Sequence, residues 1–458
     1  HPCHRSMGRV MAHEGEEMSS AIHNPHLASA LHKSKTKLLP LIVLMFALAM
    51  LDRSNVGFVK QYLETDAGIG AAAYALGAGI FFIGYALFEV PSNLILHKVG
   101  ARVWLSRIMV SWGIVSIGMM FIRDTTSFYI LRFLLGLTEA GFSPGVVLYL
   151  TYWFPNRFRS QAYGWYYLGV PIALMLGGPF TGWLLDMTPV MGLKNWQWMF
   201  LVQGVLTVIV GVFAFFWLVS RPEQAKWLSN EEKQALADEF AKDAPKDSHG
   251  HDGKTVAATF KDATVWRFVA IYFSIQMSVY GVLFYLPSKL ADLMGVKVGL
   301  QVGLVSAIPW VCTLLLLPVI TKLADKNHNW RQMAMAMLGC AVVGIGLATQ
   351  MHSVVTFVMA ITLAIIGFII VQPLFWNLPT QYLRGRSAAA GTALIGALGN
   401  LGGFVAPNMK NWAEQTFQND YAGLLALSLV GVVGLILLAT LRHKATPDAQ
   451  MTKECLND

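Results

Sequence analysis

Hydrophobic residues gather into long blocks that are separated by short polar stretches. Each block is about 20 residues long, the length of an α-helix that crosses the hydrocarbon core of a bilayer. The pattern predicts six such helices, one long polar break, and six more helices. The expected spans lie near residues 38–60, 74–96, 103–122, 127–151, 161–185, 197–219, 265–290, 299–322, 330–349, 354–377, 387–410 and 421–441.

Composition supports an integral membrane protein. The chain has 458 residues, of which 55% are hydrophobic and only 13% are charged. A soluble domain would need roughly twice this charged fraction to cover its surface. A net charge of +8 would point to nucleic acid in a soluble protein, whereas here it fits Lys and Arg in cytoplasmic loops. We therefore expect the lipid bilayer, and no nucleic acid, as a partner.

The distribution of Lys and Arg predicts the orientation. Most of these residues fall on one side of the expected spans: Lys33, Lys35, Lys37, Lys98, Arg102, Arg157, Arg159, Lys322, Lys326, Arg331, Arg384, Arg386, Arg442 and Lys444. The other side holds fewer, chiefly Lys60, Arg123, Lys194, Lys289, Lys297 and Lys410. Because Lys and Arg concentrate in cytoplasmic loops, both termini are expected in the cytoplasm of a bacterium, with the chain in its inner membrane. An even number of spans requires the same arrangement.

These signals divide the chain into five parts. They are an N-terminal tail at 1–37, a six-helix bundle at 38–219, a cytoplasmic linker at 220–264, a second bundle at 265–441 and a tail at 442–458. Within the linker, Ser229 and Glu232 have capping-box spacing, and 233–243 suits a short amphipathic helix. His249 and His251 favour a solvated linker over a metal site, because no second ligand cluster accompanies them. The four cysteines are scattered, so neither a metal nor a cofactor is expected.

A sequence repeat suggests that the two bundles are related. Trp153 and Pro155 lead to Arg157, Arg159, Ser160 and Gly164, and Trp376 and Pro379 lead to Arg384, Arg386, Ser387 and Gly391 in the same order. Both stretches follow the fourth span of their bundle. This pattern predicts two six-helix bundles with pseudo-twofold symmetry, as in transporters with parallel halves around a site at the membrane midplane.

Ionisable residues inside the spans are the candidates for function, because each costs several kcal/mol in the bilayer. Asp52 and Arg53 lie about 21 Å along the first span, and Glu139 reaches a similar depth on the fourth span from the other side. Arg132 is two turns from Glu139, and Glu89 lies in the second span. The second half offers no comparable charge; its interior polar residues include Gln276, Tyr280, Gln372, Trp376, Asn377 and Asn400.

This arrangement suits joint binding of protons and an anion. A carboxylate in a partly dry site can exchange protons near neutral pH, and an arginine keeps its charge and can hold a substrate carboxylate. We expect Asp52 and Glu139 to carry protons and Arg53 to bind the substrate. Glu89 and Arg132 are gating or structural candidates. The alternative for all of them is a buried ion-pair network that only fixes helix packing.

Several motifs resemble the anion:cation symporter family of the major facilitator superfamily. They are the stretch from Leu51 to Phe58, Pro91-Ser92-Asn93 through Arg102, the stretch from Arg132 to Gly145, Trp196 and Trp198 at the sixth span, and Pro222 through Leu228. Within the family, the chain is most similar to rhamnonate and related sugar-acid permeases. The resemblance implies a twelve-helix major facilitator fold and import of organic anions, often sugar acids, with protons.

The resemblance also implies roles for single residues. It places proton-carrying carboxylates at Asp52 and Glu139, and Arg53 and Tyr85 near the substrate. Gln372, Trp376, Asn377 and Asn400 of the second half are further candidates for substrate binding. Three departures stand out: Gln203 replaces a common glutamate, Gly396 a common asparagine, and His97 the acidic residue of a loop motif.

We therefore expect a symporter, not an enzyme, that imports an aldonate such as rhamnonate or galactonate, and that is monomeric. The rivals are a proton-coupled antiporter that exports drugs or other organic ions, and a permease for tartrate or an aromatic acid. For coupling, we expect Glu139 to take up a proton first and open the way for the anion. Asp52 would then release its proton only when the substrate competes for Arg53.

Overall fold

A computed structural model describes residues 24–188, 190–243, 256–383 and 386–441. Twelve helical segments in these residues are long and apolar enough to span a membrane, which confirms the all-α fold with twelve spans. The first six spans are α2 (Pro25–Ala67), α3 (Ala71–Val99), α4 (Ala101–Gly118) with η1 (Met119–Phe121), α5 (Thr125–Glu139) with α6 (Phe142–Trp153), α7 (Asn156–Asp186) and α8 (Asn195–Trp217). The last six are α11 (Ala263–Leu283) with α12 (Leu286–Met294), α13 (Leu300–Asn327), α14 (Trp330–Ala348), α15 (Val354–Tyr382), α16 (Arg386–Asn400) with α17 (Gly402–Thr416), and α18 (Ala422–Thr440).

The first helix begins well before its apolar block. The expected boundary lay at residue 38, but α2 starts at Pro25, where the side chain of Asn24 accepts hydrogen bonds from the backbone of His26 and Leu27. A proline in the first turn and a capping asparagine both favour a helix start. The expected tail at 1–37 therefore ends in a helical extension of the first span. Residues 1–23 and 442–458 of the two tails lie outside the described part of the chain.

The helices pair in the same way in the two halves. In the N-terminal half α2 packs on α7, α3 on α5 and α4 on α8. The equivalent spans of the C-terminal half also pair: α11 with α16, α13 with α15, and α14 with α18. Contacts between the halves follow the same relation, because α7 packs on α13 and α17 packs on α3. These matched pairs are what pseudo-twofold symmetry between two six-helix bundles requires.

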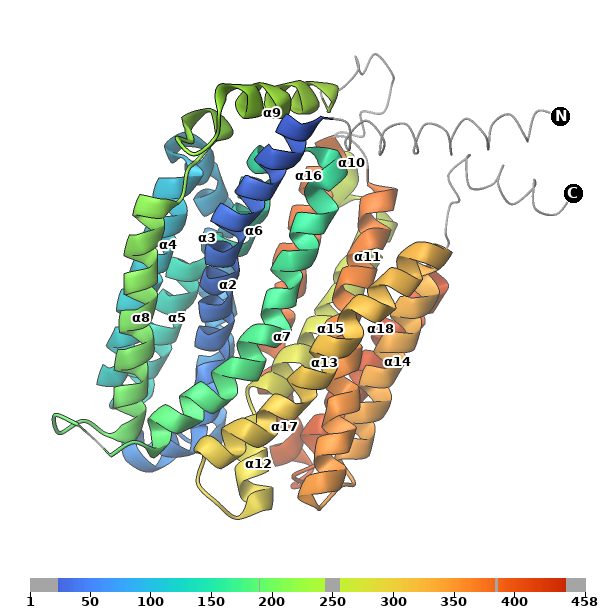
Figure 1. Ribbon diagram of the computed structural model, residues 1–458. Coiled ribbons are helices and arrows are strands. Elements are labelled where there is room, and N and C mark those ends of the chain that lie inside the picture. The colour runs from blue at the N-terminus through green and yellow to red at the C-terminus, as the bar shows by residue number, and fades with distance from the viewer. Residues whose placement is uncertain (1–23, 189, 244–255, 384–385, 442–458) are drawn as a thin grey trace, which may run out of the picture.

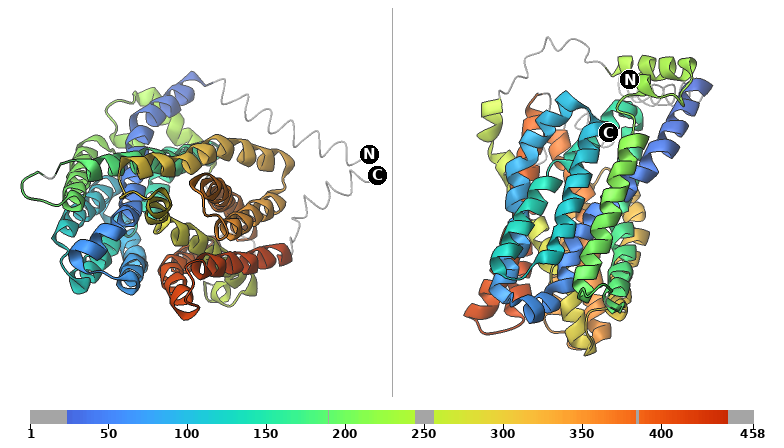
Figure 2. Two further views of the ribbon diagram at one scale, coloured as in Figure 1. Left: turned by 90° about the horizontal axis from the view of Figure 1, so that it is seen from below. Right: turned by 90° about the vertical axis from the view of Figure 1, so that its left-hand side faces the viewer.

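Both ends of the helical part of the chain lie at the same end of the molecule (Figure 1). We call this the terminal end, and the opposite one the distal end. The linker helix α9 (Asn230–Lys242) lies across the terminal end, near the start of α2 (Figure 2, right). Ser229 caps α9 as the sequence predicts, and Glu232 of α9 forms an ion pair with Lys33 at 2.7 Å. A second linker helix, α10 (Val256–Phe260), precedes α11. His249 and His251 lie outside the described residues.

The two halves are joined toward the distal end. Tyr62 donates to the carbonyl of Val298 at 2.6 Å, and the backbone N–H of Leu300 donates to Asp186 at 2.8 Å. Where α7 meets the start of α13, a Cβ added at Gly182 would collide with the backbone there, so glycine permits the close approach. Among pairs of described residues, every hydrogen bond between the halves lies at Arg53 or toward this end. This pattern is expected of a transporter whose distal side is closed.

Candidate functional site

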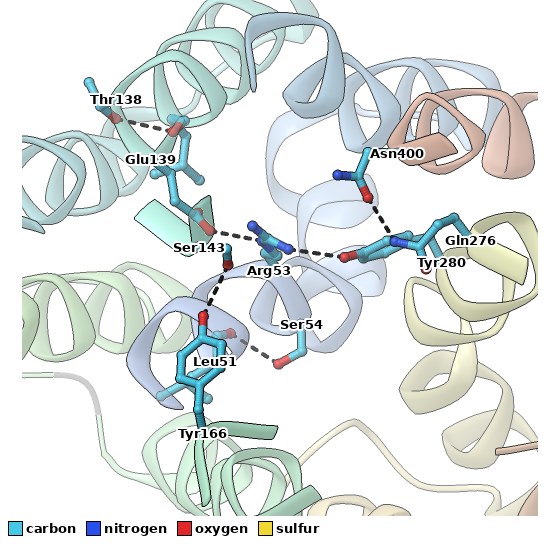
Figure 3. A network of polar contacts seen from close by, with 11 residues as sticks. Leu51, Arg53, Ser54, Thr138, Glu139, Ser143, Tyr166, Gln276, Tyr280 and Asn400 are labelled. Atoms are coloured by element: carbon cyan, nitrogen blue, oxygen red, sulfur yellow. Dashed lines mark hydrogen bonds and ion pairs between the residues drawn. The ribbon is translucent and has the colours of Figure 1, made fainter. Parts of the chain in front are cut away.

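Arg53 lies at the point where the two halves meet (Figure 3). Its Nε donates to Oε1 of Glu139 at 2.8 Å, within its own half. Its Nη1 donates to the hydroxyl of Tyr280 on α11, in the other half, at 3.2 Å. The guanidinium also lies over the ring of Tyr85, 5.2 Å from its centroid. One guanidinium thus connects a carboxylate, a hydroxyl and an aromatic face. That Arg53 and Tyr85 lie near the substrate stays a prediction.

Glu139 is the last residue of α5. The fourth span, which the sequence predicts as continuous, is interrupted here by Ala140 and Gly141. Gly141 has φ of +84°, and a Cβ at this position would collide with Ser92, so the interruption requires glycine. Glu139 is fully buried, and its Oε2 has no hydrogen-bond partner among the described residues. An unpaired acceptor on a buried carboxylate is costly, and a proton on it removes part of that cost.

Asp52 belongs to a different network, although it is adjacent to Arg53 in the sequence. Successive residues of a helix point about 100° apart, and Asp52 faces the interior of the N-terminal half. Its Oδ1 accepts from Ser116 of α4 at 2.9 Å and from Asn55 at 3.5 Å. Its Oδ2 has no hydrogen-bond partner among the described residues. The idea that Asp52 is tied to the substrate through Arg53 is therefore not supported, because the direct partner of Arg53 is Glu139.

Gln203 extends this second network. Asn55 donates to Oε1 of Gln203 at 2.9 Å, and Nε2 of Gln203 donates to Thr181 of α7 at 2.9 Å. The glutamine thus accepts on one side and donates on the other, which an ionised glutamate could not do. The network links α2, α4, α7 and α8 beside Asp52 but does not include Arg53.

Arg132 has a structural position. It is fully buried on α5 and donates to the carbonyls of Gly77 and Ala78 of α3 at 3.2 and 2.9 Å. It thereby fastens α5 to α3, which agrees with the structural option for this residue. Glu89 lies one turn beyond Tyr85 on α3, half-buried, with its Oε2 lacking a partner among the described residues. A gating role of Glu89 stays a prediction.

The C-terminal half supplies neutral groups. Nε2 of Gln276 donates to Oδ1 of Asn400 at 2.8 Å, and Gln276 lies one turn from Tyr280 on α11 (Figure 3). Asn400, which ends α16, is thereby brought close to the group around Arg53. A Cβ at Gly396, one turn earlier on α16, would meet no atom within 4 Å.

The other three candidates of this half are not joined to Arg53 by a hydrogen bond. Gln372 and Asn377 donate to carbonyls of their own helix, those of Phe368 and Pro373. Trp376 packs edge-on against Tyr272, with ring centroids 5.0 Å apart. Their substrate-binding role stays a prediction.

Sequence reasoning missed one buried charge. Lys410 was counted among the lysines of the outer side, yet it is 8% exposed and lies in the C-terminal half. Its Nζ is 2.6 Å from Oε1 of Glu414. The spacing of four residues between the two was the available signal, because it places a lysine and a carboxylate on the same face of a helix. The burial of Lys410 was not expected, because the sequence placed this lysine only among those of the outer side.

Comparisons with known proteins agree with this architecture. Residues 42–407 match the model of the Major Facilitator Superfamily. The chain is 42% identical to the "Inner membrane transport protein RhmT" of Escherichia coli (strain K12), over 94% of this chain and 98% of that protein. It is 40% identical to a "Putative tartrate transporter" of Agrobacterium vitis, over 91% of this chain and 95% of that one. It is also 40% identical to a "Quinolone resistance transporter" of Acinetobacter baumannii, over 88% and 92% of the two chains.

A solved structure supports the fold. The inward open conformation of the xylose transporter XylE from E. coli superimposes with a TM-score of 0.72 at 14% sequence identity. The match covers 92% of this chain and 99% of that one. At this identity the likeness concerns the fold alone.

Proposed function

Because the chain belongs to the Major Facilitator Superfamily and is a multi-pass transporter, not an enzyme, we propose that it imports a small organic anion together with protons across a bacterial inner membrane. Both termini would face the cytoplasm, so that the closed distal end faces the periplasm. The observation that carries the proposal is the position of Arg53. A permanent positive charge at the meeting point of the halves needs an anionic partner. Within its own half Arg53 contacts one buried carboxylate, that of Glu139, and from the other half it contacts only the neutral hydroxyl of Tyr280 among the described hydrogen-bond partners.

The geometry gives a route to coupling. While Glu139 is ionised, it holds Arg53 at 2.8 Å and competes with any substrate carboxylate. Protonation of Glu139 removes this charge, and Arg53 becomes available to form a bidentate pair with the substrate. Anion and proton then enter the site together, because each favours the other. Asp52 is a second proton site in the adjacent network, and it does not compete directly for Arg53.

The C-terminal half suits the neutral part of the substrate. Tyr280, Gln276 and Asn400 offer hydroxyl and amide groups, which can donate and accept hydrogen bonds with sugar hydroxyls. A Cβ at Gly396, one turn from Asn400, would meet no atom within 4 Å, so this position leaves space that an asparagine side chain would fill. An aldonate such as rhamnonate or galactonate has both features, a carboxylate at one end and hydroxyls along the chain. The tartrate transporter among the relatives supports the same class of ligand.

A second candidate is a proton-coupled antiporter for drugs. It is favoured by the 40% identity to the quinolone resistance transporter. Its substrates would leave the cell against the proton flux, whereas the proposed symporter brings substrate in with the flux. The direction of coupled movement therefore separates the two candidates.

The test is uptake by purified protein in proteoliposomes. The panel comprises rhamnonate, galactonate, tartrate, nicotinate and a fluoroquinolone, each measured with and without an imposed inward proton gradient. We expect counterflow exchange of at least one aldonate or tartrate, and accumulation only when the outside is more acidic. The Arg53→Ala protein serves as the matched negative control. Fluoroquinolone movement opposite to the proton gradient, without uptake of any acid, would overturn the proposal in favour of the antiporter.

A further inference from the structure

A cavity of about 390 Å³ lies inside the C-terminal half, toward the distal end and separate from Arg53. It is partly open, and it is lined by the end of α11, by α12, by residues of α15, α17 and α18, and by the connections that follow α14 and α17. Polar residues of its wall include Thr349, His352 and Asn419. A volume of this size is in the range of small-molecule binding sites, roughly 300–1,000 Å³.

Positive charge gathers around this cavity. Lys410 and Lys289 line it, and Lys410 is 8% exposed. The Nζ of Lys410 lies 3.9 Å from the centroid of the Tyr285 ring, and the Nζ of Lys60, from the N-terminal half, lies 5.9 Å from the same centroid. The ammonium groups of Lys410 and Lys289 thus lie at the cavity, and those of Lys410 and Lys60 lie over the Tyr285 ring.

Among the described carboxylates, Glu414 is the one that forms an ion pair with one of these three lysines. Glu414 pairs with Lys410, but its side chain is 26% exposed and it does not line the cavity. Asp420 lines the wall but is exposed to solvent. Lys60 and Lys289 form no ion pair with a described residue. A buried lysine with unpaired lysines beside it is electrostatically costly, and an anion in the cavity lowers that cost.

We propose that this cavity, the outer lysine cavity, is a second binding site for a small anion. Lys410 and Lys289 hold the negative charge, and the side-chain amide of Asn419 donates a hydrogen bond to it. Resting on the proposed function, the site concentrates the transported carboxylate on the distal side before it reaches Arg53. An inorganic anion such as phosphate has the same recognition chemistry, so the experiment must distinguish the two sources.

The experiment measures equilibrium binding of radiolabelled tartrate to purified protein in nanodiscs. The Arg53→Ala variant removes the central site and isolates the outer one. In this background we expect binding to remain, and Lys289→Gln to weaken it about tenfold, as for loss of a charge-assisted hydrogen bond. Lys289 is only partly buried and unpaired, so this change should leave the fold intact. Lys297→Gln, an exposed lysine at the same end of the molecule, is the matched control and should change nothing.

A second variant separates binding from mere packing. Glu414→Gln removes the carboxylate that competes with the anion for Lys410, so the affinity for tartrate should rise. If the Lys410–Glu414 pair were only structural, this variant would lower thermal stability without any gain in affinity. Binding of phosphate is measured in the same way. Displacement of bound phosphate by tartrate supports a carboxylate as the occupant. Phosphate binding without tartrate binding overturns the role in substrate delivery.

The proposal is wrong if Arg53→Ala protein binds neither anion, or if Lys289→Gln and Lys297→Gln bind equally well. These outcomes do not depend on transport. Failure of the proposed function would instead appear as absence of acid uptake by unmodified protein, with binding at the outer lysine cavity preserved.

Discussion

The two halves of this transporter share one helix arrangement but divide the chemistry unequally at their meeting point. The N-terminal half supplies Arg53, Glu139 and Asp52, each of which forms a hydrogen bond within that half. The C-terminal half adds the hydroxyl of Tyr280 and the amides of Gln276 and Asn400. The Arg53–Glu139 pair lies within one half, whereas the bond from Arg53 to Tyr280 crosses between the halves. Under the proposed function, the N-terminal half would recognise the charge of the substrate and couple it to protons, and the C-terminal half would bind its neutral groups.

The largest effect is expected from Arg53→Lys. A lysine ammonium cannot reach Glu139 and Tyr280 together or form a bidentate pair with a substrate carboxylate. A loss of about 3 kcal/mol corresponds to roughly a 150-fold fall in the initial rate of counterflow at low substrate. Arg123→Lys, at an exposed arginine near the distal end, is the control and should behave like the parent protein. A fall of only a few-fold in Arg53→Lys would show that charge recognition does not depend on this guanidinium.

Glu139→Gln tests whether the N-terminal half couples transport to protons through Glu139. The amide oxygen can still accept from Nε of Arg53, so the variant resembles the protonated site. We expect substrate exchange to continue, while accumulation disappears; one coupled proton would otherwise support about tenfold accumulation per pH unit. Uptake with and without an imposed pH gradient provides the measurement, with exposed Glu64→Gln as the control. If Glu139→Gln still concentrates substrate in response to the gradient, Glu139 is structural and the proposed order of events is wrong.

Asp52→Asn should have a smaller effect on binding. The introduced amide would keep an oxygen for the hydrogen bond from Ser116 and would leave Arg53 and Glu139 untouched. We expect weaker proton-driven accumulation with an unchanged half-saturation concentration for exchange. A marked rise in that concentration would show that Asp52 acts directly on the substrate, and would restore the link to Arg53 that the geometry does not support.

Tyr280→Phe should have the smallest effect of the four. The ring can keep its contacts with Phe82 and Phe284, and only the hydroxyl that accepts from Arg53 is lost. A loss of about 1 kcal/mol gives roughly a fivefold weaker affinity, measured by counterflow over a range of substrate concentrations. If Tyr280→Phe impairs transport as strongly as Arg53→Lys, the unequal division between the halves does not hold.

Much of the fold could be predicted from the sequence. In a bilayer every backbone polar group must be satisfied within the protein, so an apolar run of about 20 residues has the helix as its main solution. Periodic apolar blocks thus gave the number of spans. The ends of the helices were harder to predict. Helix α2 starts at Pro25 because of its cap, and the fourth span is interrupted after Glu139 by a glycine in the left-handed conformation. Both depend on local backbone geometry that hydropathy does not contain.

For the candidate site, the sequence predicted which residues take part but not which of them contact one another. The cost of charge in the membrane marked Asp52, Arg53 and Glu139, since each is conspicuous in an apolar block. Which of them would interact was decided by the tertiary structure. Packing of the N-terminal half brings Glu139 of α5 to Arg53 of α2, and the angular step of the helix directs the neighbouring Asp52 to Ser116 instead.

Lys410 in the C-terminal half also shows that the sequence pattern does not reveal the surroundings of a side chain. Its place near the end of an apolar block was visible in the sequence, but burial beside Tyr285 results from the packing of α11 against α17 and of α17 against α18. The sequence by itself determined the twelve helices and the few residues that a bilayer makes costly. The tertiary structure alone decided their partners, because contacts between helices depend on which faces meet, and residues far apart in the chain set those faces.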